Sequence, residues 1–503
     1  MADGLVAGVD CSTQGTKVLV VEAATGRVVA EGRAAHDVVG GGGARESDPN
    51  GWWTALREAL AATGVTRSIR AISVAGQQHG LVVEDERRRV LRPAVLWNDT
   101  RSAPDAAGLV EAMGGPGEWA RRIGIVPVAS FTVSKWAWLR RVSPEVAAAT
   151  RAVRLPHDYM TERLTGRGVT DRGDASGTGW WSVPGGRYDE AVLSLAGVDL
   201  DPALLAEVLG PADVAGEVRA EAAAELGLRA GVLVGPGTGD NMGAALGLGL
   251  EPGESVLSLG TSGTVFEVSE RAAADPTGTV AGFADATGRF LPLACTLNCT
   301  QAVDRVAAWL GLDREAVAPS DGVVVLPYLD GERTPNLPDA SGAIFGLRHG
   351  TAPGAILMAA YEGALVSLLD ALAAVSEQAG AGSAKCVAPG GHVSAAGTKD
   401  AAPLTLIGGG AQGAAWQSVA RRLSGRPIRV VAGLELVALG AAAQAAAALA
   451  GEEPACVARR WREARDATAA PLQPAIPADS ATVYRHREIR RLATAALVGG
   501  GSR

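Results

Sequence analysis

The chain has 503 residues, with 46 lysines and arginines against 54 aspartates and glutamates, and its formal net charge is −8. This length provides for two or three sizeable hydrophobic cores, and the mild negative charge disfavours a surface that tracks nucleic-acid phosphates. No stretch approaches the ~18 uninterrupted apolar residues of a membrane span, and the start lacks the features of a secretory signal. We therefore expect a soluble protein that binds neither nucleic acid nor membrane.

The predicted elements alternate between strand and helix along the chain. The expected strands are 5–10, 18–21, 27–30, 69–75, 231–234, 255–259, 264–268, 404–407 and 428–431. The expected helices are 134–141, 156–164, 242–248, 414–423 and 438–450. Alternating strands and helices predict an α/β fold with helices on the sheet faces, and the alanine-rich last helix suits close packing on a sheet.

One pattern occurs twice: an apolar strand, a small polar turn and a β-branched strand. It opens the chain and returns near the middle, at 255–268. The simplest interpretation is a tandem of two related α/β domains, 1–247 and 248–503. The Gly-, Ala- and Ser-rich segment 379–402 is typical of a surface loop insertion, to which we assign no chemistry.

The cysteines are odd in number and scattered along the chain. They are Cys11, Cys295, Cys299, Cys386 and Cys456. This usage is typical of free thiols in a reducing compartment, with the cytoplasm as the default, and no second Cys or His pair stands near Cys295 and Cys299 at metal-binding spacing. Lysines are few: Lys17, Lys135, Lys385 and Lys399 are the whole set, so any functional lysine belongs to it.

The first candidate site is the turn Asp10-Cys11-Ser12-Thr13-Gln14-Gly15-Thr16-Lys17. Hydroxyls, turn N–H groups and a lysine suit a polyphosphate, and an aspartate at a strand end can hold Mg²⁺ through water. The alternative is an ordinary hairpin turn with Lys17 as a solvated surface charge. The turn Gly260-Thr261-Ser262-Gly263-Thr264 repeats this chemistry in the other half, and two such turns would hold a triphosphate, which favours the functional interpretation.

Two glycine-rich loops complete the candidates. Gly235-Pro236-Gly237-Thr238-Gly239-Asp240-Asn241 follows a strand and opens a helix, so Asp240 is either a helix N-cap or a general base that glycines leave open to substrate. Gly408-Gly409-Gly410-Ala411 lies between a strand and a helix. Its missing side chains would let a flat ring lie on the backbone, although a tight strand-to-helix connection explains it equally.

These motifs, in this order, resemble the FGGY carbohydrate kinases over nearly the whole chain. The matching blocks are Gly8-Val9-Asp10 with Gln14 and Lys17, Gly76-Gln77-Gln78-His79-Gly80, Leu96-Trp97-Asn98-Asp99-Thr100-Arg101, Leu155-Pro156-His157-Asp158-Tyr159, Gly239-Asp240-Asn241, Leu259-Gly260-Thr261-Ser262-Gly263, Leu326-Pro327-Tyr328-Leu329, Gly331-Glu332-Arg333-Thr334-Pro335 and Ile407-Gly408-Gly409-Gly410-Ala411 with Trp416. The resemblance implies two ribonuclease-H-like domains of the sugar kinase, heat-shock ATPase and actin superfamily, with ATP and sugar in an interdomain cleft.

The resemblance also implies a role for each matching residue. Asp240 matches the catalytic base, and Asp10 the carboxylate near Mg²⁺, which these two aspartates would hold through water. The positions that match ATP contacts are Thr13, Gln14, Lys17, Gly260, Thr261, Ser262, Gly409, Gly410 and Ala411. Those that match or neighbour contacts to a ketopentose are Gln78, His79, Asn241, Trp97 and Asp99.

The implied reaction is ATP-dependent phosphorylation of D-xylulose at O5, with Mg²⁺ as cofactor and closure of the two domains on the sugar. The alternatives are an FGGY kinase for another ketose or polyol such as D-ribulose, a non-catalytic sugar or nucleotide sensor, and an actin-like structural or chaperone ATPase. Glycerol kinase is disfavoured, because Gln77-Gln78-His79-Gly80 is not the Arg-Glu type that glycerol kinases present there. Assembly as a homodimer is compatible with the sequence.

Overall fold

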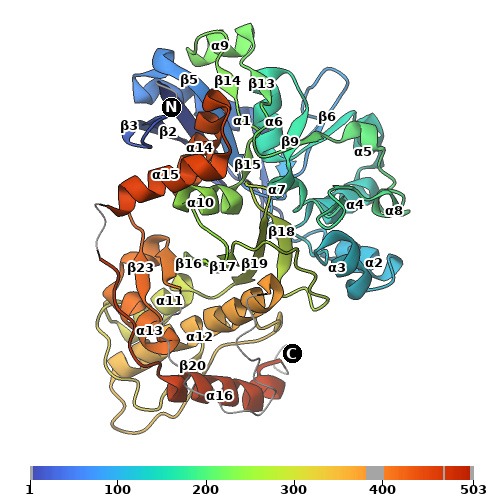
Figure 1. The fold of residues 1–503 in the computed structure, drawn as a ribbon. Coiled ribbons are helices and arrows are strands. Elements are labelled where there is room, and N and C mark those ends of the chain that lie inside the picture. Colours follow the sequence, from blue (N-terminus) through green and yellow to red (C-terminus); the bar gives the residue numbers. More distant parts are fainter. Residues whose placement is uncertain (1–3, 381–401, 468–470, 499–503) are drawn as a thin grey trace. The chain divides into compact units, whose positions relative to one another are not determined.

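The computed structural model describes residues 4–380, 402–467 and 471–498 (Figure 1). By its internal contacts the chain forms two compact units. The first comprises Met1–Leu250, Ala272–Leu291 and Glu435–Ala469, and the second comprises Glu251–Arg271, Pro292–Leu434 and Ala470–Arg503. The first unit thus extends past the boundary expected after residue 247, because two later segments pack on it. The insertion expected at 379–402 lies, apart from its ends, outside the described residues.

A mixed sheet forms the core of the first unit. Its strand order is β13-β14-β5-β1-β2-β3, with β15 also paired to β5. The strands are β1 (Leu5–Cys11), β2 (Gly15–Glu22), β3 (Val28–Ala35), β5 (Ile69–Gly76), β13 (Gly216–Glu217), β14 (Leu233–Val234) and β15 (Thr238–Gly239). β1, β14 and β15 run parallel to β5, whereas β1–β2 and β2–β3 are antiparallel. Parallel strands end at the same edge of a sheet, which decides where the loops after β1, β5 and β15 lie.

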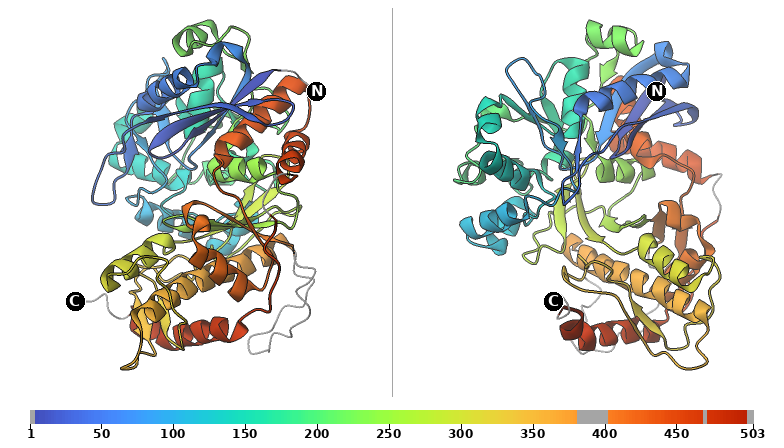
Figure 2. Two further views of the ribbon diagram at one scale, coloured as in Figure 1. Left: turned by 90° about the vertical axis from the view of Figure 1, so that its left-hand side faces the viewer. Right: turned by 180° about the vertical axis from the view of Figure 1, so that it is seen from behind.

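Helices cover both faces of this sheet. α1 (Pro49–Thr63) packs on β2 and β3, and α14 (Leu436–Ala450) packs on β1 and β5. A Cβ on Gly8 would lie 1.8 Å from the Ala438 carbonyl oxygen, so α14 approaches β1 as closely as only glycine allows. The alanine-rich helix therefore packs on the sheet as its composition predicts. In Figure 2, the red C-terminal helices α14 and α15 (Pro454–Asp466) lie beside the blue N-terminal strands.

The remaining elements of the first unit surround this core. Its further helices are α2 (Ala103–Ala112), α3 (Pro116–Ile123), α4 (Thr132–Val142), α5 (Pro144–Ala149), α6 (Pro156–Thr165), α7 (Arg172–Ala175), α8 (Glu190–Leu193), α9 (Ala220–Leu226) and α10 (Asp240–Leu248). Its further strands are β4 (Glu46–Ser47), β6 (Val82–Glu84), β7 (Ala94–Val95), β8 (Ala152–Arg154), β9 (Val169–Asp171), β10 (Trp181–Ser182), β11 (Arg187–Tyr188), β12 (Glu207–Leu209) and β18 (Ala281–Ala284).

The second unit also has a central sheet, with its strands in the order β19-β17-β16-β22-β23. They are β16 (Ser255–Leu259), β17 (Gly263–Glu267), β19 (Phe290–Thr296), β22 (Leu404–Ile407) and β23 (Ile428–Val430). The strands β20 (Val324–Leu326) and β21 (Ala343–Phe345) form a separate pair, and the helices are α11 (Thr300–Leu310), α12 (Pro353–Ala379), α13 (Ala414–Ser424) and α16 (Ser480–Val498).

The helix α12 is long and apolar enough to cross a membrane by length and composition alone. However, 78% of its apolar window is buried inside the structure, where it packs on β17, β20, α11 and α13. A buried core helix passes the same test, so α12 is explained by the core of this unit.

Every strand and helix expected from the sequence is present, with ends that differ by a few residues. The difference at α10 matters for function. Its N-cap residue is Gly239, and Asp240 is the first residue of the helix. The interpretation of Asp240 as the N-cap of this helix is therefore wrong.

Candidate active site

Three parallel strands place candidate residues at one edge of the first unit's sheet. β1 ends beside β5, with Cys11 opposite Gly76, and β15 ends beside β5, with Gly239 opposite Gly76. The residues that follow or close these strands are Asp10, Gln78 and Asp240. The carboxyl ends of parallel strands are the usual place for ligands in α/β sheets, so the topology supports a site at this edge.

Asp10 and Lys17 face each other across the β1–β2 ladder. They are direct partners in the antiparallel register, so their side chains lie on the same face of the sheet. Lys17 Nζ lies 3.8 Å from Asp10 Oδ2 and 2.7 Å from Glu435 Oε2. Asp10 is buried, and its Oδ1 has no hydrogen-bond partner. Lys17 is thus held by carboxylates rather than solvated on the surface, and Asp10 keeps one oxygen for another ligand.

The turn between these strands is closed by its own hydrogen bonds. The backbone N–H and the hydroxyl of Ser12 both donate to the Gly15 carbonyl, at 3.0 and 2.8 Å. The Thr13 hydroxyl accepts a hydrogen bond from Trp97 Nε1 at 3.1 Å, although the Trp97 side chain is 42% exposed. The Gln14 side chain is exposed. The structure therefore brings Thr13 and Trp97 together and leaves polar groups of this turn open to a ligand.

Asp240 and Asn241 are joined to the Gln78 side chain by hydrogen bonds. Asp240 Oδ1 accepts from the Asn241 backbone N–H at 2.8 Å and from Asn241 Nδ2 at 2.9 Å. Asn241 Nδ2 also donates to Gln78 Oε1 at 2.9 Å. Side chains from the loops after β5 and β15 thus meet in one polar cluster. Any side chain on Gly239 would collide with it, since an added Cβ would lie 2.7 Å from Gln78 Cγ.

The surroundings of Asp240 tune its carboxyl group for proton transfer. Burial, together with the negative charges of Asp10 and Asp174, raises the pKa of Asp240 to about 7. Burial likewise raises the pKa of Asp10 to about 6, against the opposing effect of Lys17. A general base works best with a pKa near the working pH, so Asp240 has the properties of such a base.

His79 adopts a left-handed backbone conformation, with φ 66°, which costs a non-glycine residue on the order of 1 kcal/mol. Its ring is fixed by a 2.8 Å hydrogen bond between Nδ1 and the Gly177 carbonyl oxygen, and it packs on Phe131 and Phe283. Its carbonyl oxygen accepts from Lys135 Nζ at 3.0 Å. Lys135 is fully buried, and burial lowers its pKa to about 7. Lys135 is therefore a positioning residue for His79.

A buried charged network lies behind the loop that carries Asp240. The Thr238 hydroxyl donates to Asp171 Oδ2 at 2.9 Å, and Asp171 also accepts the backbone N–H groups of Gly173 and Asp174 at 2.9 and 2.8 Å. Asp174 Oδ2 lies 2.7 Å from His157 Nδ1. All of these side chains are buried. We call Thr238, Asp171, Asp174 and His157 the buried network; it anchors the strand that ends one residue before Asp240.

The histidine of the buried network carries its positive charge. Burial by itself would lower the pKa of His157, but Asp158, Asp174 and Asp171 around it raise it to about 9. The same ring packs against two functional loops, since a Cβ on Gly237 would lie 2.4 Å from His157 Cδ2 and one on Gly76 3.2 Å from His157 Cβ. The imidazolium thus fixes the backbone before Gln78 and before Asp240.

Asp99 has a different environment from the other expected substrate contacts. It is buried, and it accepts hydrogen bonds from the Arg45 backbone N–H at 2.8 Å and from Arg101 Nη2 at 2.7 Å. Its carboxylate is therefore engaged in holding the loop behind Trp97. A contact between Asp99 and substrate stays a prediction.

In the second unit, the two candidate nucleotide loops lie against each other. β16 and β22 are parallel neighbours, with Ser258 opposite Ile407, so the turns that follow them share one edge of the sheet. A Cβ on Gly410 would lie 3.0 Å from Leu259 Cβ, whereas one on Gly409 would meet nothing within 4 Å. The Gly260 carbonyl accepts the hydroxyl of Thr300 at 2.8 Å. The two loops thus form one surface that is rich in glycines and hydroxyls. It comprises Gly260, Thr261 and Ser262 from the first loop and Gly409, Gly410 and Ala411 from the second.

Sequence reasoning missed several residues of this site. Glu435 is bonded to Lys17 but lies 418 residues away, and no sequence signal links the two. For Lys135 there was one indication of a role in the sequence, because the chain has only four lysines and Lys135 is one of them. His157 stood in a recognised block without a role, and its partners Asp171 and Asp174 carried no motif.

The chain is similar to known proteins over nearly its whole length. The chain matches the N-terminal domain of the FGGY family of carbohydrate kinases over residues 5–247 and the C-terminal domain over residues 255–449. A xylulose kinase from Streptomyces coelicolor is 59% identical over 482 residues, which cover 96% of this chain and 95% of that protein. The crystal structure of a xylulose kinase from Bifidobacterium adolescentis has a TM-score of 0.80 and 35% identity, over 97% of this chain and 99% of that one. A similar enzyme from Brucella ovis has a TM-score of 0.84 at 29% identity, over 98% of each chain. The expected two-domain fold is confirmed, and the chain belongs to the FGGY family of carbohydrate kinases.

Proposed function

We propose that the chain phosphorylates D-xylulose at O5, with ATP as phosphoryl donor and Asp240 as general base. The observation that carries the proposal is the cluster of Asp240, Asn241 and Gln78. In it, a carboxyl group with a pKa of about 7 lies beside side-chain amides that can form hydrogen bonds with the hydroxyls of a sugar. The names of the relatives support the choice of sugar, since proteins similar to this chain over nearly its whole length are xylulose kinases.

The sugar is held by Gln78, His79 and Asn241, with Trp97 beside them. Gln78 is buried and its Nε2 has no hydrogen-bond partner, so an acceptor from the sugar would satisfy a donor that the protein leaves open. His79 is oriented from two sides, by Gly177 and by Lys135 through its carbonyl. Fixed polar groups of this kind distinguish sugars that differ only in the orientation of one hydroxyl.

In the proposed reaction, Asp240 accepts the proton of the 5-hydroxyl as that oxygen attacks the γ-phosphorus of ATP. The bond from the γ-phosphorus to the bridging oxygen breaks, and ADP leaves with the electron pair. Lys17 stabilises negative charge on the transferred group, together with Thr13 and Gln14. Gly260, Thr261 and Ser262 would bind phosphates, and Gly409, Gly410 and Ala411 would lie along the adenosine.

A magnesium ion fits the carboxylates of this site. Asp10 Oδ1 is buried without a hydrogen-bond partner, and the negative charge of Asp10 raises the pKa of Asp240, so a cation would relieve the repulsion between the two carboxylates. Among the described residues, no three His, Cys, Asp or Glu side chains come together as a direct ligand set. Asp10 and Asp240 would therefore hold Mg²⁺ through water, and the ion would neutralise charge on the phosphates of ATP.

The test is ADP release by the purified protein with Mg-ATP, compared among D-xylulose, D-ribulose, L-xylulose, glycerol and no sugar. We expect kcat/KM to be at least tenfold higher for D-xylulose than for any other sugar, and slow ADP release without sugar, because water can then accept the phosphoryl group. A higher kcat/KM for D-ribulose would overturn the choice of substrate. If no sugar raised turnover above the sugar-free rate, the chain would be a sensor on a kinase fold.

A further inference from the structure

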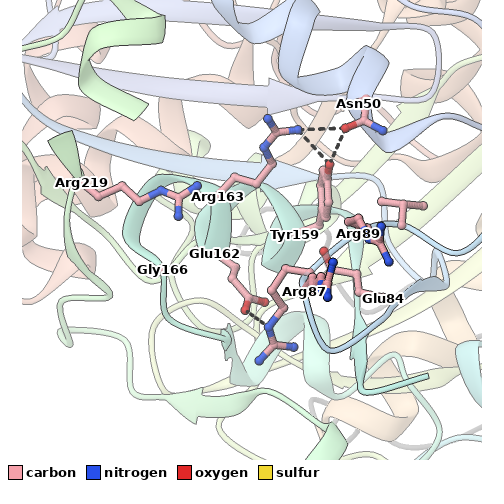
Figure 3. A pocket seen from close by; sticks show the side chains of 11 residues that line it. Asn50, Glu84, Arg87, Arg89, Tyr159, Glu162, Arg163, Gly166 and Arg219 are labelled. Carbon is pink, nitrogen blue, oxygen red and sulfur yellow. Dashed lines mark hydrogen bonds and ion pairs between the residues drawn. The ribbon is translucent and has the colours of Figure 1, made fainter. Parts of the chain in front are cut away.

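The first unit contains a polar cavity that is formed by none of the residues assigned to sugar or ATP. Its volume is about 520 Å³. It is lined by the hairpin turn 84–90, by the side of α6 that carries Tyr159, Glu162 and Arg163, and by single residues that include Asn50 and Arg219 (Figure 3). A cavity of this size accommodates a small metabolite rather than a single ion.

Five arginines and two glutamates line the cavity, so its charge favours an anion. Some of the arginines are already paired. Arg88 Nε lies 3.2 Å from Glu162 Oε1, and Arg163 Nη1 donates to Asn50 Oδ1 at 3.1 Å and to Tyr159 Oη at 3.0 Å. Glu162 is also paired with Arg154, outside the cavity. One glutamate is therefore neutralised twice over, and the excess charge of the wall is positive.

Two arginines stay available to a ligand. Within the described part of the chain, no side chain pairs with the Arg219 guanidinium, which is exposed, and the Arg87 guanidinium approaches only the carboxylate of its neighbour Glu86, at 4.0 Å. Arg88 adopts φ 58°, a conformation that a non-glycine residue rarely takes, and this turn brings three consecutive arginines to the rim. Guanidinium groups bind phosphate oxygens with paired, charge-assisted hydrogen bonds.

The floor of the cavity offers a group of another kind. Glu84 is only 3% exposed, and its Oε2 has no hydrogen-bond partner. A buried polar atom without a partner is unfavourable, and a bound hydroxyl would supply the missing hydrogen bond. Burial and the nearby charge of Glu162 raise the pKa of Glu84 to about 7, so the carboxyl group tolerates a phosphate in the same cavity.

From this arrangement we infer that the cavity is a binding site for the phosphate monoester of a small polyol. The phosphate lies among Arg219, Arg87 and Arg163, and a hydroxyl of the polyol bonds to Glu84. A free phosphate ion shares the first contact but not the second, and it would leave most of the cavity to water. The site goes beyond the proposed kinase activity, because none of its groups takes part in that reaction.

The test is isothermal titration calorimetry at low ionic strength, with D-xylulose present in excess to occupy the sugar site. The probes are D-ribose 5-phosphate and inorganic phosphate. The variants are Arg219→Gln, Glu84→Gln and, as matched control, Arg229→Gln, an exposed arginine outside the cavity. Arg219 and Arg229 lack side-chain partners among the described residues, so neither change disturbs the fold, and thermal unfolding verifies this.

We expect Arg219→Gln to weaken the binding of D-ribose 5-phosphate at least fivefold, and Glu84→Gln at least threefold, with Arg229→Gln unchanged. Inorganic phosphate should bind more weakly than the ester, and Glu84→Gln should not affect it. Equal affinity of the wild type and Arg219→Gln, equal losses in Arg229→Gln, absence of binding, or phosphate as tight as the ester would each overturn the inference. Heat is measured rather than turnover, so failure of the proposed kinase activity would leave this test intact.

Discussion

The hydroxyl of Thr238 can be removed almost without change of shape, by Thr238→Val. In the wild type it donates to Asp171 Oδ2 at 2.9 Å, in a position that is fully buried. The substitution removes one hydrogen bond to a buried carboxylate, and the loss of such a bond lowers the free energy of unfolding by about 1.5–3 kcal/mol. Asp171 keeps the backbone N–H groups of Gly173 and Asp174, so we expect a loss of about 2 kcal/mol in the free energy of unfolding.

The chain offers a matched control in Thr161→Val. Thr161 is also fully buried, but its hydroxyl has no hydrogen-bond partner, so its loss should leave stability unchanged or raise it. The assay is urea unfolding followed by tryptophan fluorescence, together with kcat for phosphorylation. Because Thr238 lies two residues before Asp240, we expect kcat of Thr238→Val to fall on the order of tenfold. A Thr238→Val protein as stable as the wild type, or an equal loss in Thr161→Val, would refute the anchoring role of the buried network.

Three further predictions concern single groups. Because the pKa of Asp240 is raised to about 7, kcat/KM measured across pH should fall about tenfold per unit below pH 7, and a flat profile down to pH 5 would contradict its role as base. The pKa of Lys135 is lowered to about 7 in the folded protein, so between pH 7 and 10 only the unfolded chain binds this proton. Wild-type stability in urea should then rise with pH by up to about 1.4 kcal/mol per unit relative to Lys135→Met, and parallel curves would contradict the assignment. Glu435→Gln releases Lys17 from a half-exposed ion pair, so it should change stability by less than about 1 kcal/mol and lower KM for ATP, whereas a raised KM would mean that the pair helps to place Lys17.

The fold could be predicted where local pattern decides it. Short apolar and β-branched runs identified β1, β2 and β5, and the glycine at 166 marked the end of α6, where it adopts a left-handed conformation. The packing of α14 on the first unit could not be predicted, because it depends on contacts with β1 and β5, which lie at least 360 residues earlier in the chain. Periodicity reports which face of a helix is buried, but not which sheet buries it.

The candidate site, too, could be predicted only where its residues are close together in the sequence. Short blocks located Asp10, Gln78 and Asp240, since their chemistry lies in adjacent residues. The buried network was invisible, because His157 and Thr238 come from separate segments and only folding joins them to Asp171 and Asp174. The arginine-lined cavity was equally hidden, since arginines 87–89 have the sequence pattern of a solvated charged turn.

The most direct test of the central claim is the rate of D-xylulose 5-phosphate formation by Asp240→Asn. The substitution keeps the shape of the side chain and removes the base, and the control is Asp321→Asn, at an exposed residue with φ 47° that asparagine adopts equally well. We expect Asp240→Asn to lower kcat by a factor on the order of 10²–10⁴, with binding of ATP and D-xylulose retained and with Asp321→Asn fully active. A kcat for Asp240→Asn within tenfold of the wild type would show that Asp240 is not the general base.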